Sequence, residues 1–275
     1  MERVKPSGPF EVDYESLEED APTAGRIALL PWDSNVFGFP VADYRLGEEQ
    51  HLEPATLARK LSKWEERYGV SLVSCRVSAH RAALGDALST AGFRFIELQL
   101  RATLPRLRAA KLTASRLTVR AAVPNDRARL LAISETAFRF GRYHADARFP
   151  RALADRRYRA WLEAALDSPS QESRVYVVGP AGRPGGFLHT TVRGHLADFR
   201  LAGVDPEDSG IAGPELFLGT LKLLAAEGIE QVTGRLSAAN TSAVNLYASL
   251  FFRFHEPELV FHRGQPRAGD GTTAS

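Results

Sequence analysis

Asn240 and Tyr247 are the residues of this chain whose types and spacing are best suited to chemistry. They lie in a segment whose apolar residues recur at three- and four-residue steps, which predicts an amphipathic helix. Seven residues are nearly two helical turns, so the amide and the phenol share one face of that helix. A phenol donates a proton, and an amide holds a ligand by hydrogen bonds. The structural alternative is a helix-capping Asn and a core Tyr.

Extended runs flank this helix, at residues 231–236 and 253–262. A strand–helix–strand unit with Asn at the helix entrance and Tyr one to two turns in resembles the last third of the GNAT acyltransferase fold. The resemblance implies that Asn240 contacts coenzyme A and that the Tyr247 hydroxyl protonates the departing thiolate.

The elements before this unit extend the resemblance to a whole domain. Strands are predicted at residues 117–121, 174–178, 186–192 and 196–204. Helices are predicted at 124–138 and 151–166, and a third helix ends at about residue 227. Pro, Asn and Gly signals mark the helix starts and the hairpin turns. The order β-α-α-β-β-β-α-β-α-β is that of a GNAT domain, so the expected fold class is α/β (α+β).

Attack of an amine on a thioester requires a cradle for the coenzyme's pyrophosphate, polarisation of the carbonyl, an acid and a base. Backbone N–H groups and a helix dipole hold phosphates well. This chain matches the pyrophosphate-binding loop of GNAT proteins imperfectly. Ser209 replaces the usual basic or amide residue, and Pro214 removes one backbone N–H donor. An ordinary tight turn that caps a helix is the alternative. The resemblance places the cradle at Ser209, Gly210, Ile211, Ala212 and Gly213.

The strand that ends at Val204 occupies the place of the bulged strand of GNAT proteins. The resemblance implies that the backbone N–H of Leu201 or Ala202 faces the thioester carbonyl. It also implies that Val204 lies beside the coenzyme.

Asp198 is the first candidate for the base. It stands near the position where some GNAT members carry a carboxylate, and a solvated strand carboxylate is an equal alternative. His144 and His189 compete for the role, since a neutral imidazole accepts a proton near pH 7. Loss of the amine proton through ordered water is a further alternative.

Two segments narrow the resemblance within the family. The run LPWDSNVFG at residues 30–38 and the run FRFGRYHADARF at residues 138–149 resemble signatures of bacterial dTDP-fucosamine acetyltransferases. An aromatic core and a turn cap are the alternatives for the first run. The second run is expected to be a long loop, and loops carry binding groups. The implied substrate contacts are Trp32, Asp33, Arg142, His144 and Asp146.

The chain also repeats itself. Residues 69–104 align without gaps with residues 228–263, and identical Arg, Ser and Phe-Arg-Phe positions accompany the shared apolar pattern. A gapless match of this kind indicates a tandem duplication. Leu88 stands where the second copy has Tyr247, so the first copy is interpreted as a structural or substrate-binding remnant.

The expected organisation follows from the repeat and from composition. It is a loose arm at residues 1–24, a degenerate GNAT-like domain at 25–105, a linker at 106–115, a catalytic GNAT domain at 116–263 and a loose tail at 264–275.

Composition limits the classes of function. The 275 residues are 44% apolar and 25% charged with a net charge of +2, as in ordinary globular proteins. The Arg residues are scattered, which argues against nucleic-acid binding, and no apolar run approaches the roughly 20 residues that span a membrane. Cys75 is alone, which excludes a cysteine-based metal cage, and no metal is expected. The N-terminus lacks an apolar signal core, which predicts a cytoplasmic protein.

These features predict an acetyl-CoA-dependent N-acetyltransferase for a small-molecule amine, first of all that of a nucleotide-linked amino sugar. A peptide, amino acid or antibiotic amine is the alternative substrate, and a homodimer is left open. A non-catalytic acyl-CoA-binding or scaffold protein is the alternative class, motivated by Ser209, Pro214 and Phe251. Phe251 stands where the family usually has a helix-ending Gly, so it is expected to end the helix differently or to protrude into a pocket.

Overall fold

A computed structural model describes the chain apart from residues 1–13, 18–24, 47–52, 108–111, 113–114 and 266–275. Most of the predicted N-terminal arm and C-terminal tail, and much of the predicted linker, lie outside the described residues. The chain divides into two compact units, the first with residues 1–98, 142–157 and 257–275, the second with 99–141 and 158–256. Each unit combines separate segments, so neither coincides with the contiguous domains 25–105 and 116–263 expected from the sequence.

The sheet of the first unit has the strand order β1-β2-β3-β4-β11. β3 and β4 run parallel and are joined by helix α2 (Pro54–Tyr68), whereas the other neighbours are antiparallel. A parallel pair needs such a crossover. The strands are β1 (Glu15–Ser16), β2 (Arg26–Leu29), β3 (Val41–Arg45), β4 (Leu72–Ser78) and the end of β11 (Arg253–Gly264).

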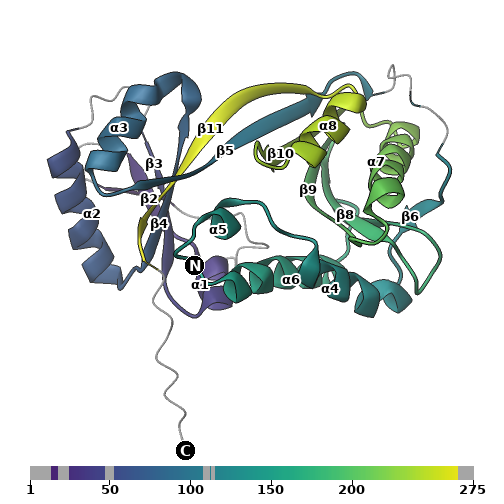
Figure 1. Ribbon diagram of the computed structural model, residues 1–275, viewed down its shortest axis with the longest axis horizontal. Helices are drawn as coiled ribbons and strands as arrows, with labels where there is room; N and C mark the ends of the chain where they lie inside the picture. The colour runs from purple at the N-terminus through teal and green to yellow at the C-terminus, as the bar shows by residue number, and fades with distance from the viewer. Residues whose placement is uncertain (1–13, 18–24, 47–52, 108–111, 113–114, 266–275) are drawn as a thin grey trace, which may run out of the picture. The chain divides into compact units, whose positions relative to one another are not determined.

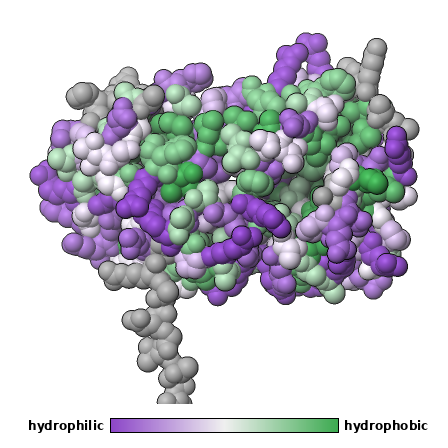
Figure 2. All heavy atoms as spheres, viewed as in Figure 1, coloured by the Kyte–Doolittle hydropathy of each residue, from purple (hydrophilic) through white to green (hydrophobic). Residues whose placement is uncertain are grey.

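Helices cover both faces of this sheet. α2 and α3 (Ala82–Thr90) bury leucines against one face, and α1 (Pro31–Phe37) and the one-turn α5 (Arg142–Ala145) bury aromatic side chains against the other. In α2 the buried Leu57 and Leu61 are one turn apart, while Arg59, Lys63 and Glu66 are exposed. Hydrophilic surface lies at the left of Figure 2, on the side where Figure 1 draws α2. The amphipathic pattern of α2 therefore determines which face of the helix packs on the sheet.

The sheet of the second unit has the strand order β5-β10-β9-β8-β7-β6 (Figure 1). β9 and β10 run parallel around helix α7 (Ser209–Ala226), and the other neighbours are antiparallel. The strands are β5 (Arg94–Leu104), β6 (Val119–Ala121), β7 (Ser173–Val178), β8 (Gly186–Arg193), β9 (Leu196–Val204) and β10 (Gln231–Ser237).

Two pairs of helices complete the second unit. α7 and α8 (Thr241–Ser249) pack apolar side chains on one face of the sheet. α4 (Arg127–Thr136) and the second half of α6 (Arg151–Asp167) do so on the other. Within the described part of the chain, no helix is long and apolar enough to cross a membrane.

The repeat seen in the sequence has the same secondary structure in both copies. β4, α3 and β5 begin at Leu72, Ala82 and Arg94, and β10, α8 and β11 each begin 159 residues later. The strand registers match as well. Val77 pairs with Leu259 in the first unit and, at the same offset, Leu236 pairs with Leu100 in the second. Agreement of both boundaries and register supports a duplication.

In each copy the last strand pairs in the other unit. β5 follows β4 along the chain but pairs with β10, and β11 follows β10 but pairs with β4. The copies thus exchange their final strands, and this exchange is one reason why the compact units are discontinuous in sequence.

Phe251 ends α8 in the conformation that glycine usually adopts. Its φ is +66°, and the N–H groups of Phe251 and Phe252 return to the carbonyls of Ala248 and Tyr247, both at 3.0 Å. The same two bonds close α3, where Gly92 has φ +91°. Phe251 therefore ends the helix as a glycine would, with its side chain 60% exposed.

Phe251→Gly is expected to raise the free energy of unfolding by about 1 kcal/mol, because a left-handed φ costs a non-glycine residue roughly 1–2 kcal/mol and glycine's larger chain entropy offsets part of the gain. Urea denaturation of the full chain measures it. The matched control is Gly92→Ala, which should lower stability by a similar amount. A lower free energy of unfolding in Phe251→Gly would show that the left-handed φ of Phe251 is not strained.

Candidate active site

A β-bulge at Arg200 interrupts β9. His189 of β8 pairs with Leu201 and Thr190 pairs with Phe199, so the register between β8 and β9 shifts by one residue at Arg200. In a regular strand Phe199 and Leu201 would share a face, but Phe199 packs with the residues of α7 and α8 and Leu201 with those of α4 and α6. The bulge therefore reverses the side-chain alternation in the second half of the strand.

The parallel ladder between β9 and β10 ends at this bulge. Its last pair is Phe199 with Gly234, although β9 continues to Val204 and β10 to Ser237. Beyond that pair, no further ladder pair joins the described residues of the two strands. Backbone groups that turn toward the gap are available to an extended ligand. The three predicted coenzyme contacts on β9 lie in this stretch: Leu201, Ala202 and Val204.

Tyr247 reaches the point where the ladder ends. Its ring is 5% exposed and packs against Phe217 and Phe252, with centroids 5.4 and 4.7 Å away. A Cβ placed on Gly234 would lie only 2.8 Å from the Tyr247 hydroxyl, so the phenol rests directly on β10. Burial raises the pKa of Tyr247 well above its ordinary value, and the Asp198 carboxylate raises it further. The phenol therefore keeps its proton at neutral pH.

Asp198 lies on the opposite face of the sheet. Its neighbours Ala197 and Phe199 pack in the same cluster as Tyr247, so its own side chain points the other way. One carboxylate oxygen accepts from Arg200 Nη1 at 2.6 Å, and the other accepts from Thr233 Oγ1 at 2.8 Å. The two residues predicted to be catalytic thus flank the end of the ladder from its two faces.

His189, a second candidate base, is buried on the Asp198 face. Its Nε2 lies 3.0 Å from Ser173 Oγ, and its ring meets Trp161 of α6 edge-on at 6.5 Å. Burial, together with the Arg200 guanidinium, lowers the pKa of His189 to about 4, and the Asp198 carboxylate opposes part of this change. The imidazole is neutral at pH 7.

Neutral His189 makes stability depend on pH. The unfolded chain binds a proton near pH 6.5, whereas the folded chain binds it only near pH 4. The contribution of neutral His189 to the free energy of unfolding is therefore complete above about pH 6.5, and it is lost as the pH falls toward 4. Urea denaturation at both ends of this range should show a smaller decline for His189→Gln than for the wild type. Equal declines would contradict this assignment.

The predicted phosphate cradle forms the first turn of α7 and not a loop before it. The helix begins at Ser209, and the amides of Ile211 and Ala212 return to the Asp208 carbonyl at 3.2 and 2.9 Å. Asp208 makes no side-chain cap at this N-terminus. Helix N-termini of this kind bind anions.

The corresponding helix of the first unit has its N-terminus occupied. The Glu53 carboxylate accepts from the amides of Ala55 and Thr56 at 3.2 and 2.7 Å. α2 links the parallel pair β3 and β4 as α7 links β9 and β10. The first unit therefore holds its own carboxylate at a helix terminus where Asp208 of the second unit makes no side-chain cap.

Asn240 is the N-cap of α8. Its Oδ1 accepts from the Ala243 amide at 3.1 Å, so the capping role named as an alternative is present. Only the Nδ2 side of the amide is left for a ligand. Contact with coenzyme A stays a prediction for this residue.

Solved structures of similar fold identify the architecture. A GCN5-related N-acetyltransferase from Sphaerobacter thermophilus matches with a TM-score of 0.60 at 16% identity, over 89% of this chain and 78% of that one. A tandem GNAT protein from the clavulanic acid biosynthesis pathway matches with a TM-score of 0.55 at 13% identity, over 88% and 79%. This chain has the GNAT fold.

Sequence comparison finds more limited likeness. No protein-family model matches. The mycothiol acetyltransferase of Acidothermus cellulolyticus is 32% identical over 97 residues, or 34% of this chain and 30% of that protein. That of Thermobispora bispora is 32% identical over 127 residues, or 41% and 43%. This chain thus aligns with less than half the length of these curated relatives.

The two motifs predicted to contact substrate meet in the first unit. Asp33 accepts from Arg157 Nε at 2.6 Å and from the Tyr143 hydroxyl at 3.3 Å, and Arg142 Nη2 lies 3.5 Å away. Asp33 is 4% exposed. The half-buried Trp32 ring faces the Arg157 guanidinium at 5.5 Å. These contacts join α1 to α5 and α6, so the motifs form an interlock between segments far apart in sequence.

His144 and Asp146 are also tied internally. His144 Nε2 lies 2.8 Å from Asp155 Oδ1. Asp146 accepts from Arg148 Nε and Nη2, both at 2.9 Å, and one of its oxygens lies 2.9 Å from His262 Nδ1. Burial raises the pKa of Asp146, but the hydrogen bonds from His262 and Arg148 outweigh it and hold the pKa low. The predicted loop is therefore a short helix and a turn anchored by ion pairs, and substrate contact stays a prediction.

Three residues beside the candidate site were not singled out from the sequence. Gly234 lies under the Tyr247 phenol, and Thr233 and Arg200 bind the Asp198 carboxylate. A glycine inside a strand signals close approach of another group, so Gly234 was open to detection. Thr233 and Arg200 carry no such signal.

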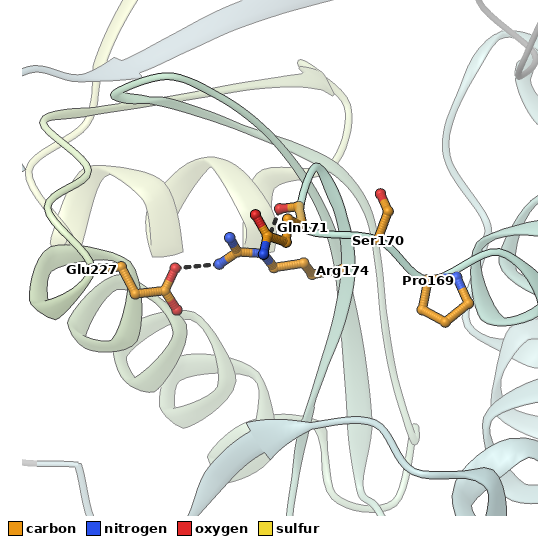
Figure 3. A pocket seen from close by; sticks show the side chains of 5 residues that line it. All are labelled: Pro169, Ser170, Gln171, Arg174 and Glu227. Carbon is orange, nitrogen blue, oxygen red and sulfur yellow. Dashed lines mark hydrogen bonds and ion pairs between the residues drawn. The ribbon is translucent and has the colours of Figure 1, made fainter.

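A separate surface hollow of about 600 Å³ is lined by Pro169, Ser170, Gln171, Arg174 and Glu227 (Figure 3). Arg174 Nε donates to the Gln171 carbonyl at 2.7 Å, and its guanidinium pairs with Glu227. Glu227 follows the last residue of α7, whereas the cradle is at the first, and 18 helical residues span about 27 Å. The hollow thus lies at the opposite end of α7 from the predicted phosphate cradle. Among the described residues, no cluster of three or more His, Cys, Asp or Glu could hold a metal.

Proposed function

We propose that this chain transfers the acetyl group of acetyl-CoA to a primary amine of a small molecule. The observation that carries the proposal is a buried, protonated phenol at the point where two parallel strands stop pairing. A ligand threaded between the strands would meet Tyr247 on one face and Asp198 on the other. The GNAT fold, and two curated relatives that are acetyltransferases by name, support the proposal.

The second unit fits the coenzyme. Beyond Phe199, β9 makes no further ladder pair with β10 among the described residues, and a strand edge of this kind suits an extended pantetheine chain. The N-terminus of α7 lacks a side-chain cap from Asp208 and suits a pyrophosphate; its first residues are Ser209, Gly210, Ile211, Ala212 and Gly213. Asp205 precedes this terminus, and its carboxylate is neutralised by an ion pair with Arg129. Bound acetyl-CoA supplies the thioester.

The proposed chemistry divides among three groups of this chain. The backbone N–H of Leu201 or Ala202 polarises the thioester carbonyl. Asp198 accepts the proton that the attacking amine loses, and Tyr247 gives its proton to the sulfur that leaves. The amine gains the acetyl group and the coenzyme departs as a neutral thiol, so protons balance once Asp198 and Tyr247 exchange theirs with solvent.

The acceptor is proposed to be a nucleotide-linked amino sugar. The resemblance of residues 30–38 and 138–149 to dTDP-fucosamine acetyltransferases motivates this choice. A second candidate is the amine that mycothiol acetyltransferases acetylate, and the 32% identity to two such proteins favours it. A cytoplasmic location and a homodimer stay predictions.

Thiol release from acetyl-CoA with a panel of amines tests the function. The full chain is used, because β10 pairs with β5 from the first copy. We expect acetylated product with one of the two candidate acceptors, identified by mass spectrometry, and little with peptide, amino acid or antibiotic amines.

Calorimetry with coenzyme A separates the remaining outcomes. One site per chain is expected, because Glu53 occupies the equivalent helix terminus of the first unit. Binding without acetylation of any amine would favour the non-catalytic acyl-CoA-binding alternative. Absence of binding would overturn the proposal.

A further inference from the structure

We propose that Gly234 is a positioning residue, whose missing side chain lets the Tyr247 hydroxyl rest on β10 where the ladder to β9 ends. The inference deepens the proposed function and rests on it, since it assigns to Gly234 the placement of the acid. Gly234 takes no part in the chemistry itself; its missing side chain leaves room for the Tyr247 hydroxyl.

The geometry leaves no room for a side chain at this position. A Cβ on Gly234 would lie 2.8 Å from the Tyr247 hydroxyl oxygen, 3.0 Å from Cε1 and 3.3 Å from Cζ. Carbon atoms in van der Waals contact are separated by about 3.5–4.0 Å. Any larger residue at position 234 must therefore displace the phenol.

The Tyr247 ring has little freedom to move aside. Phe217 and Phe252 pack against it, and the residue is almost fully buried. Close-packed interiors transmit such an insertion as a shift of the neighbouring group. The hydroxyl, which is the atom nearest to the added carbon, is displaced first.

Backbone conformation gives no other reason for a glycine here. Gly234 is not among the residues with left-handed φ, and it pairs on both sides, with Phe199 and with Ala102. Glycine in a strand interior weakens the strand, so its presence calls for a compensating contact. The phenol is that contact.

The other copy of the repeat supports the same conclusion. At the 159-residue offset, Gly234 corresponds to Cys75 and Tyr247 to Leu88. Cys75 and Leu88 are fully buried in one cluster of the first unit. Where the helix carries the shorter Leu the strand carries a side chain, and where the helix carries Tyr the strand carries none. The two positions therefore differ together between the copies.

A double-mutant cycle tests the inference. A misplacement of about 1 Å can cost about 10²-fold in rate, so Gly234→Ala should lower kcat by about 10- to 100-fold with the KM for acetyl-CoA unchanged. In a Tyr247→Phe background, which lacks the hydroxyl, Gly234→Ala should lower kcat by less than about threefold. An equal loss in both backgrounds would overturn the inference.

A readout independent of turnover distinguishes this failure from failure of the proposed function. A crystal structure of Gly234→Ala should show the Tyr247 hydroxyl displaced from β10 by about 1 Å, because the added Cβ takes its place. If the wild type acetylates no amine but the hydroxyl is displaced, Gly234 positions the phenol and only the function is wrong. An undisplaced hydroxyl in folded Gly234→Ala would overturn the inference.

Discussion

Tyr247→Phe is expected to lower kcat by about 10²–10⁴-fold, the usual contribution of a general acid. The phenol carries its proton at neutral pH, as an ordinary tyrosine does, and burial and the Asp198 carboxylate raise its pKa further. Its proton is needed only as the thiolate leaves, so the loss should appear in the transition state and not in coenzyme binding. Steady-state kinetics and calorimetry with acetyl-CoA measure the two effects separately.

The substitution is nearly isosteric, so its effect on the fold should be small. It removes one oxygen atom and keeps the aromatic contacts of the ring with Phe217 and Phe252. Urea denaturation should therefore show a stability close to that of the wild type, and a lower kcat then reports on the hydroxyl alone. Unchanged turnover in Tyr247→Phe would remove Tyr247 from the mechanism.

The sequence alone predicted the elements that carry this site. Apolar residues at helical spacing predicted the helix that the structure places at Thr241–Ser249, and alternating segments predicted β7, β8 and β9. The α/β fold class is confirmed by the structural match to GNAT proteins. These features depend on local periodicity, which is visible in one segment at a time.

Features that depend on pairing between distant strands were not visible. The bulge at Arg200 reverses the alternation of β9, and only the register against β8 reveals it. The exchange of β5 and β11 was hidden for a different reason. Because the two strands are repeats of one another, each suits either sheet, and composition cannot say which sheet a strand joins.

Burial of charge was the third feature that the sequence concealed. Asp33 and Arg142 were predicted to contact substrate, because the segments that carry them resemble signatures of dTDP-fucosamine acetyltransferases. The structure instead pairs Asp33 with residues 110 and 124 positions away. Such partners cannot be identified from spacing, so the same two motifs favoured a binding role in the sequence and form an interlock in the structure.

Asp33→Asn is expected to lower the free energy of unfolding by about 3–5 kcal/mol. The side chains of Asp33 and Arg157 are 5% and 8% exposed, so the substitution leaves a guanidinium buried beside a neutral amide. Arg142, 3.5 Å from Asp33, loses an opposite charge as well. Removing one partner of a buried pair costs more than the pair contributes, because the remaining charge stays desolvated.

Urea denaturation of the full chain measures the change, with Glu256→Gln as the matched control. Glu256 and its partner Arg101 are 62% and 42% exposed, so that substitution should cost less than about 1 kcal/mol. Acceptor kinetics of folded Asp33→Asn decide between the two roles. If Asp33 holds the acceptor, KM for the amine rises while stability stays near that of the wild type. If Asp33 is part of the interlock, stability falls, and the remaining folded protein keeps its KM.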